Sequence, residues 1–318
     1  MSKLAAVVLA AGVSSHKGNF KPMLSVDGQT LIQRVIAAMR KAGAESIVVV
    51  TGYKREVLEE HLADAGVIFV HNAAYYETQM LDSLLLGLMA LPPEVERVLI
   101  CPADLPLIKP QTIQALLATA GDFVRPSYQG TTGRPIIVSP HLLQTLREYR
   151  GDGGIRAAID FCGIIPVDVP VDDPGIILDD HDIRDEYAAL LKYHRQMTDM
   201  PQPLQLDLQI GLQAETAFWG PDCAQFLELI QTTGSMLNAC QCMHMSYSRG
   251  WRMINEIERQ LGYPLILRSQ GGSNGGGSEL TPMGKQFLAS FQKMQEEIRE
   301  ESQAIFARYF PSGYLKSE

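Results

Sequence analysis

The sequence has little of what marks exported, membrane-spanning or disulfide-stapled proteins. It contains five cysteines in 318 residues, and none forms a C-x-x-C pair. We therefore expect neither a disulfide framework nor a zinc knuckle, and we expect a reducing cytoplasm. The N-terminal apolar run is short and continues into a basic segment, which argues against a signal peptide. No run approaches the roughly 18 apolar residues of a membrane span, so we expect no membrane partner.

Basic charge is also scarce. The chain has 27 Lys and Arg against 36 Asp and Glu, a formal net charge of −9. This balance argues against a general polyanion binder, although it leaves room for a local basic face. Hydrophobic residues make up 46% of the chain and charged residues 20%, which is ordinary globular composition. The length suits two domains of roughly 100 to 200 residues each.

From residue 4 to about 191, short β-branched runs alternate with amphipathic stretches. Continuous apolar strands separated by helices predict a mostly parallel sheet with helices on both faces. Ligands of such sheets lie where loops leave the carboxyl ends of the strands. The strands are expected at 5–11, 46–52, 67–71, 97–106, 122–128 and 134–139, and the helices at 31–43, 55–66, 81–91 and 111–121.

The alternation of strand-like and helix-like segments ends at a polar segment with two prolines, Arg195 to Gln205. We therefore predict a first domain at 1–195, a linker at 196–204 and a second domain at 205–318. Three helices, a strand, a glycine-rich run and a further strand-like run predict a winged helix-turn-helix. Its helices are expected at 221–234, 235–245 and 246–262, its strands around 264–270 and 279–284, and a long last helix at 285–310.

The loop at 9–21, LAAGVSSHKGNFK, follows the first predicted strand. Its glycines suit backbone amides turned toward a triphosphate, with Lys21 paired to phosphate oxygens. A plain tight turn is the alternative. Asp104 follows another predicted strand between two prolines, where it could hold Mg²⁺ or cap the next helix.

This loop resembles the signature of the MobA/MocA-like nucleotidyltransferases, LAAG-x-S-x-R-M-G-x-x-K. His16 and Lys17 stand at the arginine and methionine positions. Histidine is mostly neutral at pH 7 and cannot bind phosphate bidentately, so we expect His16 to weaken triphosphate binding and Lys17 to supply charge from the next position. The matching residues are Leu9, Ala10, Ala11, Gly12, Ser14, Gly18 and Lys21.

Three further segments are similar to elements of that family. Residues 72–88 match at Asn72, Tyr75, Met80, Ser83 and Leu84, with Gln79 in place of a glycine. The resemblance implies that Asn72, Met80 and Ser83 lie against the nucleotide base, and the LAAG form leans toward CTP. Segments 151–157 and 178–187 resemble two other family elements, which implies Asp152 or Asp182 as a second metal ligand beside Asp104; a helix cap is the alternative for each.

About residues 204–310 resemble the amino-terminal DNA-binding domain of ModE-type molybdate-responsive regulators. The resemblance rests mainly on TGS at 233–235, SYSRGW at 246–251 and the glycine-rich run at 271–278, a wing tip. We expect DNA contacts from the start of the recognition helix and from the wing. The residues are Ser246, Tyr247, Ser248, Arg249, Arg252, Arg268 and Asn274, while Trp251 is expected in the core.

The last predicted helix carries apolar residues in a heptad-like pattern. This seam predicts either a homodimer interface or packing against the linker. Residues 205–318 hold 9 basic and 12 acidic side chains, so we expect DNA binding to need the dimer and to be sensitive to salt. The seam consists of Phe287, Phe291, Met294, Ile298 and Ile305.

Together the resemblances imply a Rossmann-like, doubly wound, mostly parallel sheet of the nucleotide-diphospho-sugar transferase type, then an α+β winged helix-turn-helix. The implied reaction joins CTP (or GTP) to the molybdopterin cofactor and releases pyrophosphate, with Lys21, Asp104 and Mg²⁺ acting on the phosphates. The product would serve a molybdenum hydroxylase, and the second domain would bind double-stranded DNA. The alternative is a transcription regulator whose first domain only senses nucleotide or pterin cofactor.

Overall fold

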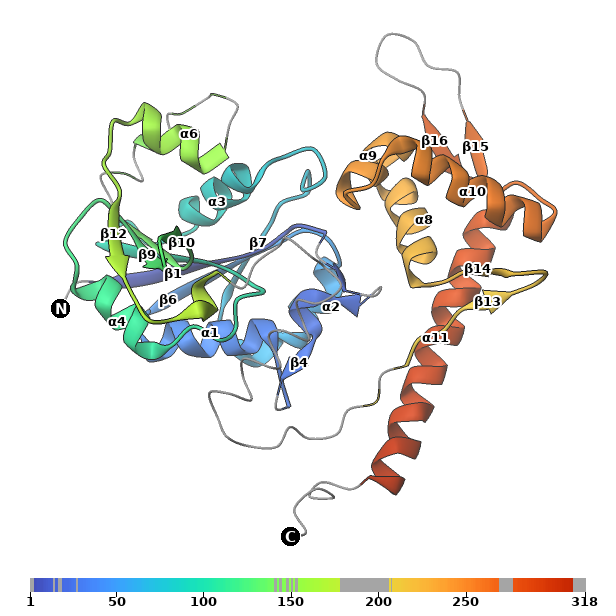
Figure 1. Cartoon of the computed structure of the whole chain (residues 1–318), viewed down its shortest axis with the longest axis horizontal. Coiled ribbons are helices and arrows are strands. Elements are labelled where there is room, and N and C mark those ends of the chain that lie inside the picture. The colour runs from blue at the N-terminus through green and yellow to red at the C-terminus, as the bar shows by residue number, and fades with distance from the viewer. Residues whose placement is uncertain are drawn as a thin grey trace. The chain divides into compact units, whose positions relative to one another are not determined.

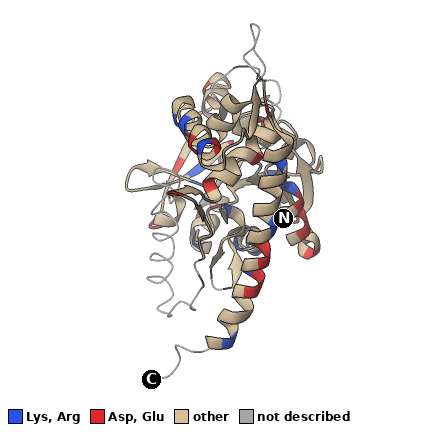
Figure 2. Ribbon diagram, turned by 90° about the vertical axis from the view of Figure 1, so that its right-hand side faces the viewer, with Lys and Arg blue, Asp and Glu red and all other residues tan. Residues whose placement is uncertain are grey.

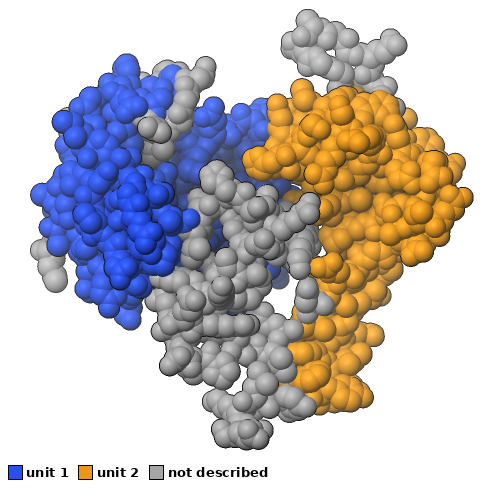
Figure 3. Space-filling view, viewed as in Figure 1, with its two compact units in different colours: residues 1–16, 20–198 blue, residues 17–19, 199–318 orange. Residues whose placement is uncertain are grey.

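The computed structural model describes residues 3–13, 15–16, 19–26, 28–139, 142, 145–146, 149, 151, 154–177, 206, 208–268 and 277–310. The chain forms two compact units, residues 1–16 with 20–198 and residues 17–19 with 199–318 (Figure 3). The boundary between residues 198 and 199 falls within the segment predicted as the linker.

The first unit is built on an eight-stranded sheet, counted over the described residues, with the order β10-β9-β11-β8-β1-β6-β7 and β12 beside β9. Strand β1 lies between β6 and β8 and runs parallel to both. Only β10 and β11 run against their neighbours. The strands are β1 Leu4–Ala10, β6 Ser46–Thr51, β7 Ile68–His71, β8 Arg97–Pro102, β9 Phe123–Tyr128, β10 Thr131–Thr132, β11 Ile136–Val138 and β12 Val167–Pro170.

Helices cover both faces of this sheet, as Figure 1 shows, with α3 and α6 on one side and α1 and α4 on the other. One apolar core lies between the sheet and α3, where Val7, Val50 and Ile100 of the strands pack with Leu84 and Leu88. The helices are α1 Leu31–Lys41, α2 Arg55–His61, α3 Met80–Met89, α4 Pro110–Ala118 and α6 Gly154–Phe161, with short 3-10 turns at Lys21–Met23, Ala63–Ala65 and Pro174–Ile176.

The predicted strands and helices of this unit are all present, because long apolar runs and amphipathic periods dominate their sequences. The mostly parallel, doubly covered sheet is confirmed. The sequence did not predict β12, which alternates in burial along its length, nor α6. It also missed two short hairpins, β2 Ser15–His16 with β3 Asn19–Phe20 and β4 Ser25–Val26 with β5 Gln29–Thr30.

The second unit is a helix-turn-helix with a two-stranded wing. Side-chain oxygens of Ser235, Ser246 and Thr281 cap three of its helices at their N-termini. Gly250 lets α10 approach the others closely, since a Cβ there would lie 2.6 Å from the sulfur of Cys240 and 2.7 Å from the ring of Phe226. The elements are α8 Pro221–Thr233, α9 Met236–Cys242, α10 Tyr247–Leu261, β15 Ile266–Arg268, β16 Ser278–Leu280 and α11 Pro282–Tyr309.

A second hairpin, β13 Leu212–Gln213 with β14 Ala217–Trp219, precedes α8 and was not predicted. It ends in Trp219, which is buried and packs edge-on against Phe287 and Phe291 at ring-centroid distances of 4.7 and 5.5 Å. The first part of the predicted seam therefore packs inside its own unit. Ile298 and Ile305, further along α11, are exposed.

None of the described helices is long and apolar enough to cross a membrane. All five cysteines lie in described parts of the chain, and all five are free thiols. The second unit holds three of them, of which Cys240 is buried between α9 and α10.

Candidate nucleotide site and nucleic-acid interface

The loops after β1, β6 and β8 meet at the carboxyl edge of the sheet. In the ladder Leu9 pairs with Pro102 and Ala10 pairs with Thr51, so the residues that follow these pairs leave the sheet side by side. The N–H of Ala103 donates to the carbonyl of Leu9 at 3.0 Å. Strand order reverses at β1, which is where open α/β sheets bind their ligands.

Two glycines at this edge have opposite surroundings. Gly52 presses on the first loop, since a Cβ there would lie 2.4 Å from the carbonyl oxygen of Ala11. Gly12 is exposed, and a Cβ there would meet nothing within 4 Å. Packing within this chain explains Gly52 but not Gly12. Gly12 leaves room for a ligand to approach the backbone closely.

Aromatic side chains connect the loop after β1 with the loop after β6. The ring of Tyr53 packs edge-on against Phe20 at 5.7 Å and near Tyr75 at 6.3 Å, and the N–H of Tyr53 donates to the carbonyl of Ala11 at 3.0 Å. Lys21 directly follows Phe20 and is only 8% exposed. These aromatic side chains therefore fix the backbone from which Lys21 extends.

Asn72 is a hydrogen-bonding centre of the segment predicted to face the base. It is buried, its amide donates to the hydroxyls of Thr78 at 2.8 Å and Ser83 at 2.9 Å, and it accepts from the N–H of Ala74 at 3.1 Å. These contacts shape the segment from inside. Met80 is different, because it begins α3 and its side chain is 53% exposed. A nucleotide role for Asn72, Met80 and Ser83 stays a prediction.

Asp104 lies two residues beyond β8 and is half-buried at the same edge as Ala11 and Gly12. Among the described residues no group of three or more His, Cys, Asp or Glu side chains gathers as a metal centre. One carboxylate is still enough for Mg²⁺, which binds through one or two carboxylates, waters and substrate phosphates.

Several predicted site residues cannot be placed. Ser14, Lys17, Gly18, Asp152, Asp182 and Asn274 lie outside the described residues, and only the backbone is described for His16 and Arg268.

The predicted DNA-contacting residues gather at the N-terminus of α10. Ser246 caps the helix by accepting from the N–H of Arg249 at 3.3 Å. The side chains of Ser246, Tyr247, Ser248, Arg249 and Arg252 are all exposed, whereas Trp251 is half-buried. This arrangement is that of a recognition helix whose first turn is open to a major groove.

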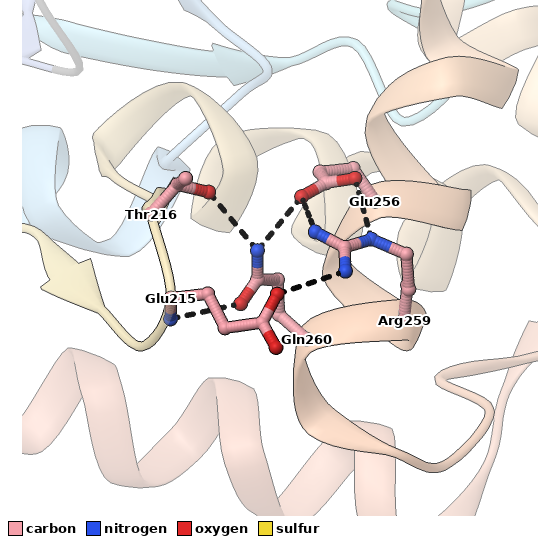
Figure 4. A network of polar contacts seen from close by, with 5 residues as sticks. All are labelled: Glu215, Thr216, Glu256, Arg259 and Gln260. Carbon is pink, nitrogen blue, oxygen red and sulfur yellow. Dashed lines mark hydrogen bonds and ion pairs between the residues drawn. The ribbon is translucent and has the colours of Figure 1, made fainter.

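The opposite end of α10 is held by a polar network that the sequence did not reveal (Figure 4). The guanidinium of Arg259 bridges Glu256, at 2.7 and 3.1 Å, and Glu215 of the β13–β14 hairpin, at 3.1 Å. Gln260 donates to the hydroxyl of Thr216 at 3.0 Å and to the carboxylate of Glu256 at 2.9 Å. These hydrogen bonds to Arg259 and Gln260 lower the pKa of Glu256 from 4.5 to about 2.

Acidic side chains mark the far part of α11, along the helix that leads toward the C mark in Figure 2. They are Glu296, Glu297, Glu300 and Glu301, all exposed. They repel a polyanion, so this part of α11 is unfavourable for contact with DNA.

Two families match the chain. The family described as MobA-like NTP transferase domain matches residues 6–171, more than half of the chain. The chain belongs to this family. The family described as bacterial regulatory helix-turn-helix protein, lysR family, matches residues 224–285. The protein thus carries a nucleotidyltransferase domain followed by a helix-turn-helix regulator domain.

Known proteins resemble the MobA-like domain in sequence or in fold. The bifunctional protein GlmU of Francisella tularensis subsp. novicida is 34% identical over 122 residues, 37% of this chain and 26% of that protein. The chain therefore spans about a quarter of the length of the curated relatives it matches. Rv0371c of Mycobacterium tuberculosis has the same fold, with a TM-score of 0.52, 22% identity, and coverage of 60% of this chain and 98% of that one.

A nucleotidyl transferase from Methanothermobacter is similar too, with a TM-score of 0.52, 22% identity, and coverage of 62% of this chain and 100% of that one. These likenesses confirm the fold of the MobA-like domain. The expected ModE type of the second domain is corrected, because the matching helix-turn-helix family is the lysR family. Helix-turn-helix domains share one packing scheme, so their short sequence signals do not separate the types well.

Sequence reasoning missed two residues at the candidate nucleotide site, Gly52 and Tyr53. Gly52 ends the strand predicted at 46–52 and Tyr53 follows it, and a glycine inside a strand pattern is a recognised signal of close backbone approach. Their role depends on contact with Ala11, some forty residues earlier, which the local sequence does not reveal.

We predict that the two glycines respond oppositely to alanine. Gly52→Ala should lower the free energy of unfolding by about 1–3 kcal/mol, because the new methyl overlaps a backbone carbonyl. Gly12→Ala should leave it within about 0.5 kcal/mol, since the methyl finds open space, yet it should weaken nucleotide binding. Urea unfolding and nucleotide titration of the full chain measure both effects. Equal destabilisation by the two changes would refute this account of the edge.

We also predict an acid-sensitive last turn of α10, because the carboxylate of Glu256 accepts from Arg259 and Gln260 of the same helix. The pKa of Glu256 is lowered in the folded chain, so its contribution to stability is present above about pH 4.5 and is lost as the pH falls toward 2. Protection of amides 256–262 against hydrogen exchange, taken relative to the intrinsic exchange rate at each pH, should fall over that window. Glu256→Gln should weaken this pH dependence. Protection in the native chain that does not change across the window would contradict this account.

Proposed function

We propose that the first domain transfers a nucleotidyl group from CTP, or from GTP, to the molybdopterin cofactor and releases pyrophosphate. One observation supports nucleotidyl transfer. Three loops meet where the strand order of the sheet reverses, and they carry the exposed Gly12, the buried Lys21 and Asp104. The choice of CTP and of molybdopterin rests on the sequence resemblance alone. So does a molybdenum hydroxylase as the user of the product.

In this proposal the loop after β1 binds the phosphates of the nucleotide. The amides after β1 wrap the phosphates of the triphosphate, and Lys21 offsets the charge that develops on the oxygens around the α-phosphate. Lys17 replaces part of the charge that His16 lacks. The attacking group is a phosphate oxygen of the acceptor, which needs no strong general base. The sequence motifs include no obvious His or Cys catalytic triad, and this chemistry does not require one.

A divalent metal belongs to the proposal, with Asp104 as its principal ligand and Asp182 as the second. Bound there, Mg²⁺ would neutralise charge on the phosphates during transfer. Asp104 fits the role because it lies at the strand end beside the loop, and carboxylate oxygens are what Mg²⁺ prefers. Rv0371c, which shares the fold, has been crystallised as a complex with manganese.

The second domain is proposed to bind double-stranded DNA as a homodimer in the cytoplasm. The exposed first turn of α10 carries two arginines and three hydroxyl groups suited to bases and phosphates. The exposed far seam of α11, represented by Ile298 and Ile305, is the proposed dimer contact. The alternative function is a regulator that senses nucleotide or pterin without catalysis. It is favoured by His16, Lys17 and Gln79, which depart from the family signature.

Asp104→Ala should reduce pyrophosphate release by at least about 100-fold, because the metal that neutralises the phosphates loses its principal ligand. DNA affinity should be unchanged, since the substitution lies in the other domain. The measurement is pyrophosphate release from CTP, GTP and ATP with molybdopterin. Wild-type rates in the variant would remove Asp104 from the mechanism, and no release by the native chain would favour the sensing alternative.

For the second domain, Arg249→Ala should weaken operator binding by about 1–3 kcal/mol and leave the dimer intact. Ile305→Glu should instead dissociate the dimer and weaken DNA binding as a consequence. Operator titration at fixed salt, with sedimentation velocity on the same samples, separates the two. A monomeric native chain that still binds its operator tightly would contradict the dimer.

A further inference from the structure

A buried carboxylate joins the loop after β8 to a segment late in the first domain. Asp173 is 0% exposed. Its Oδ2 accepts from the backbone N–H of Lys109 at 2.8 Å and from the hydroxyl of Thr112 at 2.6 Å. Its Oδ1 accepts from the N–H of Gly175 at 3.0 Å. A buried charge is tolerable only when hydrogen-bonded in this way.

These bonds make Asp173 a cap for α4 that comes from a distant part of the chain. Lys109 holds the N-cap position of α4, and its own side chain provides no cap. The carboxylate of Asp173 supplies the missing acceptor and places negative charge at the positive end of the helix. A local serine or aspartate at position 109 would stabilise the helix as well. A remote cap additionally fixes two segments to each other.

The loop between β8 and α4 is thereby fixed at both ends. At its start the N–H of Ala103 binds the carbonyl of Leu9 at 3.0 Å, and at its end the N–H of Lys109 binds Asp173. Asp104 lies between these two anchors. Leu105, Leu107 and Ile108, which share the loop, are buried.

The segment around Asp173 is itself held against that loop. The ammonium of Lys109 donates to the carbonyl of Asp172 at 2.6 Å. A Cβ on Gly175 would lie 2.6 Å from the carbonyl of Leu107, so the two backbones are in direct contact. The carbonyl of Ile176 accepts from the N–H of Arg134 at 2.9 Å. We call segment 172–176 the brace. It is anchored to a third segment at Arg134 as well as to loop 103–109.

We propose that Asp173 is a positioning residue for Asp104: its buried carboxylate sets the conformation of loop 103–109 and so the place of the metal-binding carboxylate. This inference rests on the proposed function of Asp104. The physical reason is that metal and phosphate sites tolerate misplacements of well under 1 Å, and a loop anchored at one end only does not meet that tolerance.

Two variants and one matched control test the brace. Asp173→Asn keeps the shape but turns an amide N–H₂ toward N–H or O–H donors. Thr112→Val removes one donor at nearly constant volume. Thr119→Val is the control. Thr119 is the C-cap of α4, and its hydroxyl donates to the carbonyl of Ala115 at 2.8 Å and not to Asp173.

The first measurement is hydrogen exchange of amides 103–109 in the full chain without ligands. Exchange should accelerate at least about fivefold in Asp173→Asn and Thr112→Val and stay at the native rate in Thr119→Val. Native exchange in both brace variants would overturn the brace, whatever the protein's activity.

The second measurement is Mn²⁺ titration in the presence of CTP. Thr112→Val should weaken Mn²⁺ binding about 3- to 10-fold and Asp173→Asn by more, the loss of a hydrogen bond to a charged group being the cause. In an Asp104→Ala background Thr112→Val should have no further effect, whereas a purely structural role would add its loss.

The outcomes separate the two proposals. Faster loop exchange with unchanged Mn²⁺ affinity overturns positioning and leaves the metal site standing. A native chain that binds no Mn²⁺, or equal Mn²⁺ binding after Asp104→Ala, overturns the metal site and positioning with it, and the exchange data then show the brace alone.

Discussion

The candidate nucleotide site depends on the register in which β1 lies between β6 and β8. Pairing of Leu9 with Pro102 and of Ala10 with Thr51 brings three chain segments to one edge, and each then departs into a different loop. A slip of one residue would turn the side chains of β1 to the opposite face. Both faces of β1 are buried, and its alanine, valine and leucine side chains differ in size, so a slip would change the side chain at every closely packed position. The packing of the core therefore specifies the geometry of the polar edge.

Polar and steric contacts then fix the conformation of the loops that follow these strands. Gly52 and Tyr53 support Ala11, and Asn72 shapes the turn into α3 through Thr78 and Ser83. These contacts lie between residues that a ligand would reach and the core behind them. The predicted ligand site therefore depends on residues behind it that position the loops, as well as on the side chains that would contact the ligand.

The local sequence predicted what depends on local pattern. Strands β1, β6 and β8 are long apolar runs, and the cap of α10 at Ser246 follows the standard preference for serine. Asp173 could not be predicted, because it lies in the polar run VDDPG and its partners are more than sixty residues away. The sequence also did not show which residues of the α11 seam pack inside the unit. The unpredicted hairpin brings Trp219 onto Phe287 and Phe291, and this contact makes the first part of the seam internal.

The pairing of a nucleotidyltransferase domain with a helix-turn-helix regulator domain has a thermodynamic consequence. If nucleotide or pterin in the first domain changes DNA affinity by some factor, DNA must change the affinity for that ligand by the same factor. A ligand bound equally in both states shifts nothing, however tightly it binds. With a net charge of −3, residues 205–318 gain little from non-specific attraction to DNA. Specific contacts from the exposed first turn of α10 therefore matter more for DNA binding than overall charge does, and Arg259 joins the other end of that helix to the β13–β14 hairpin.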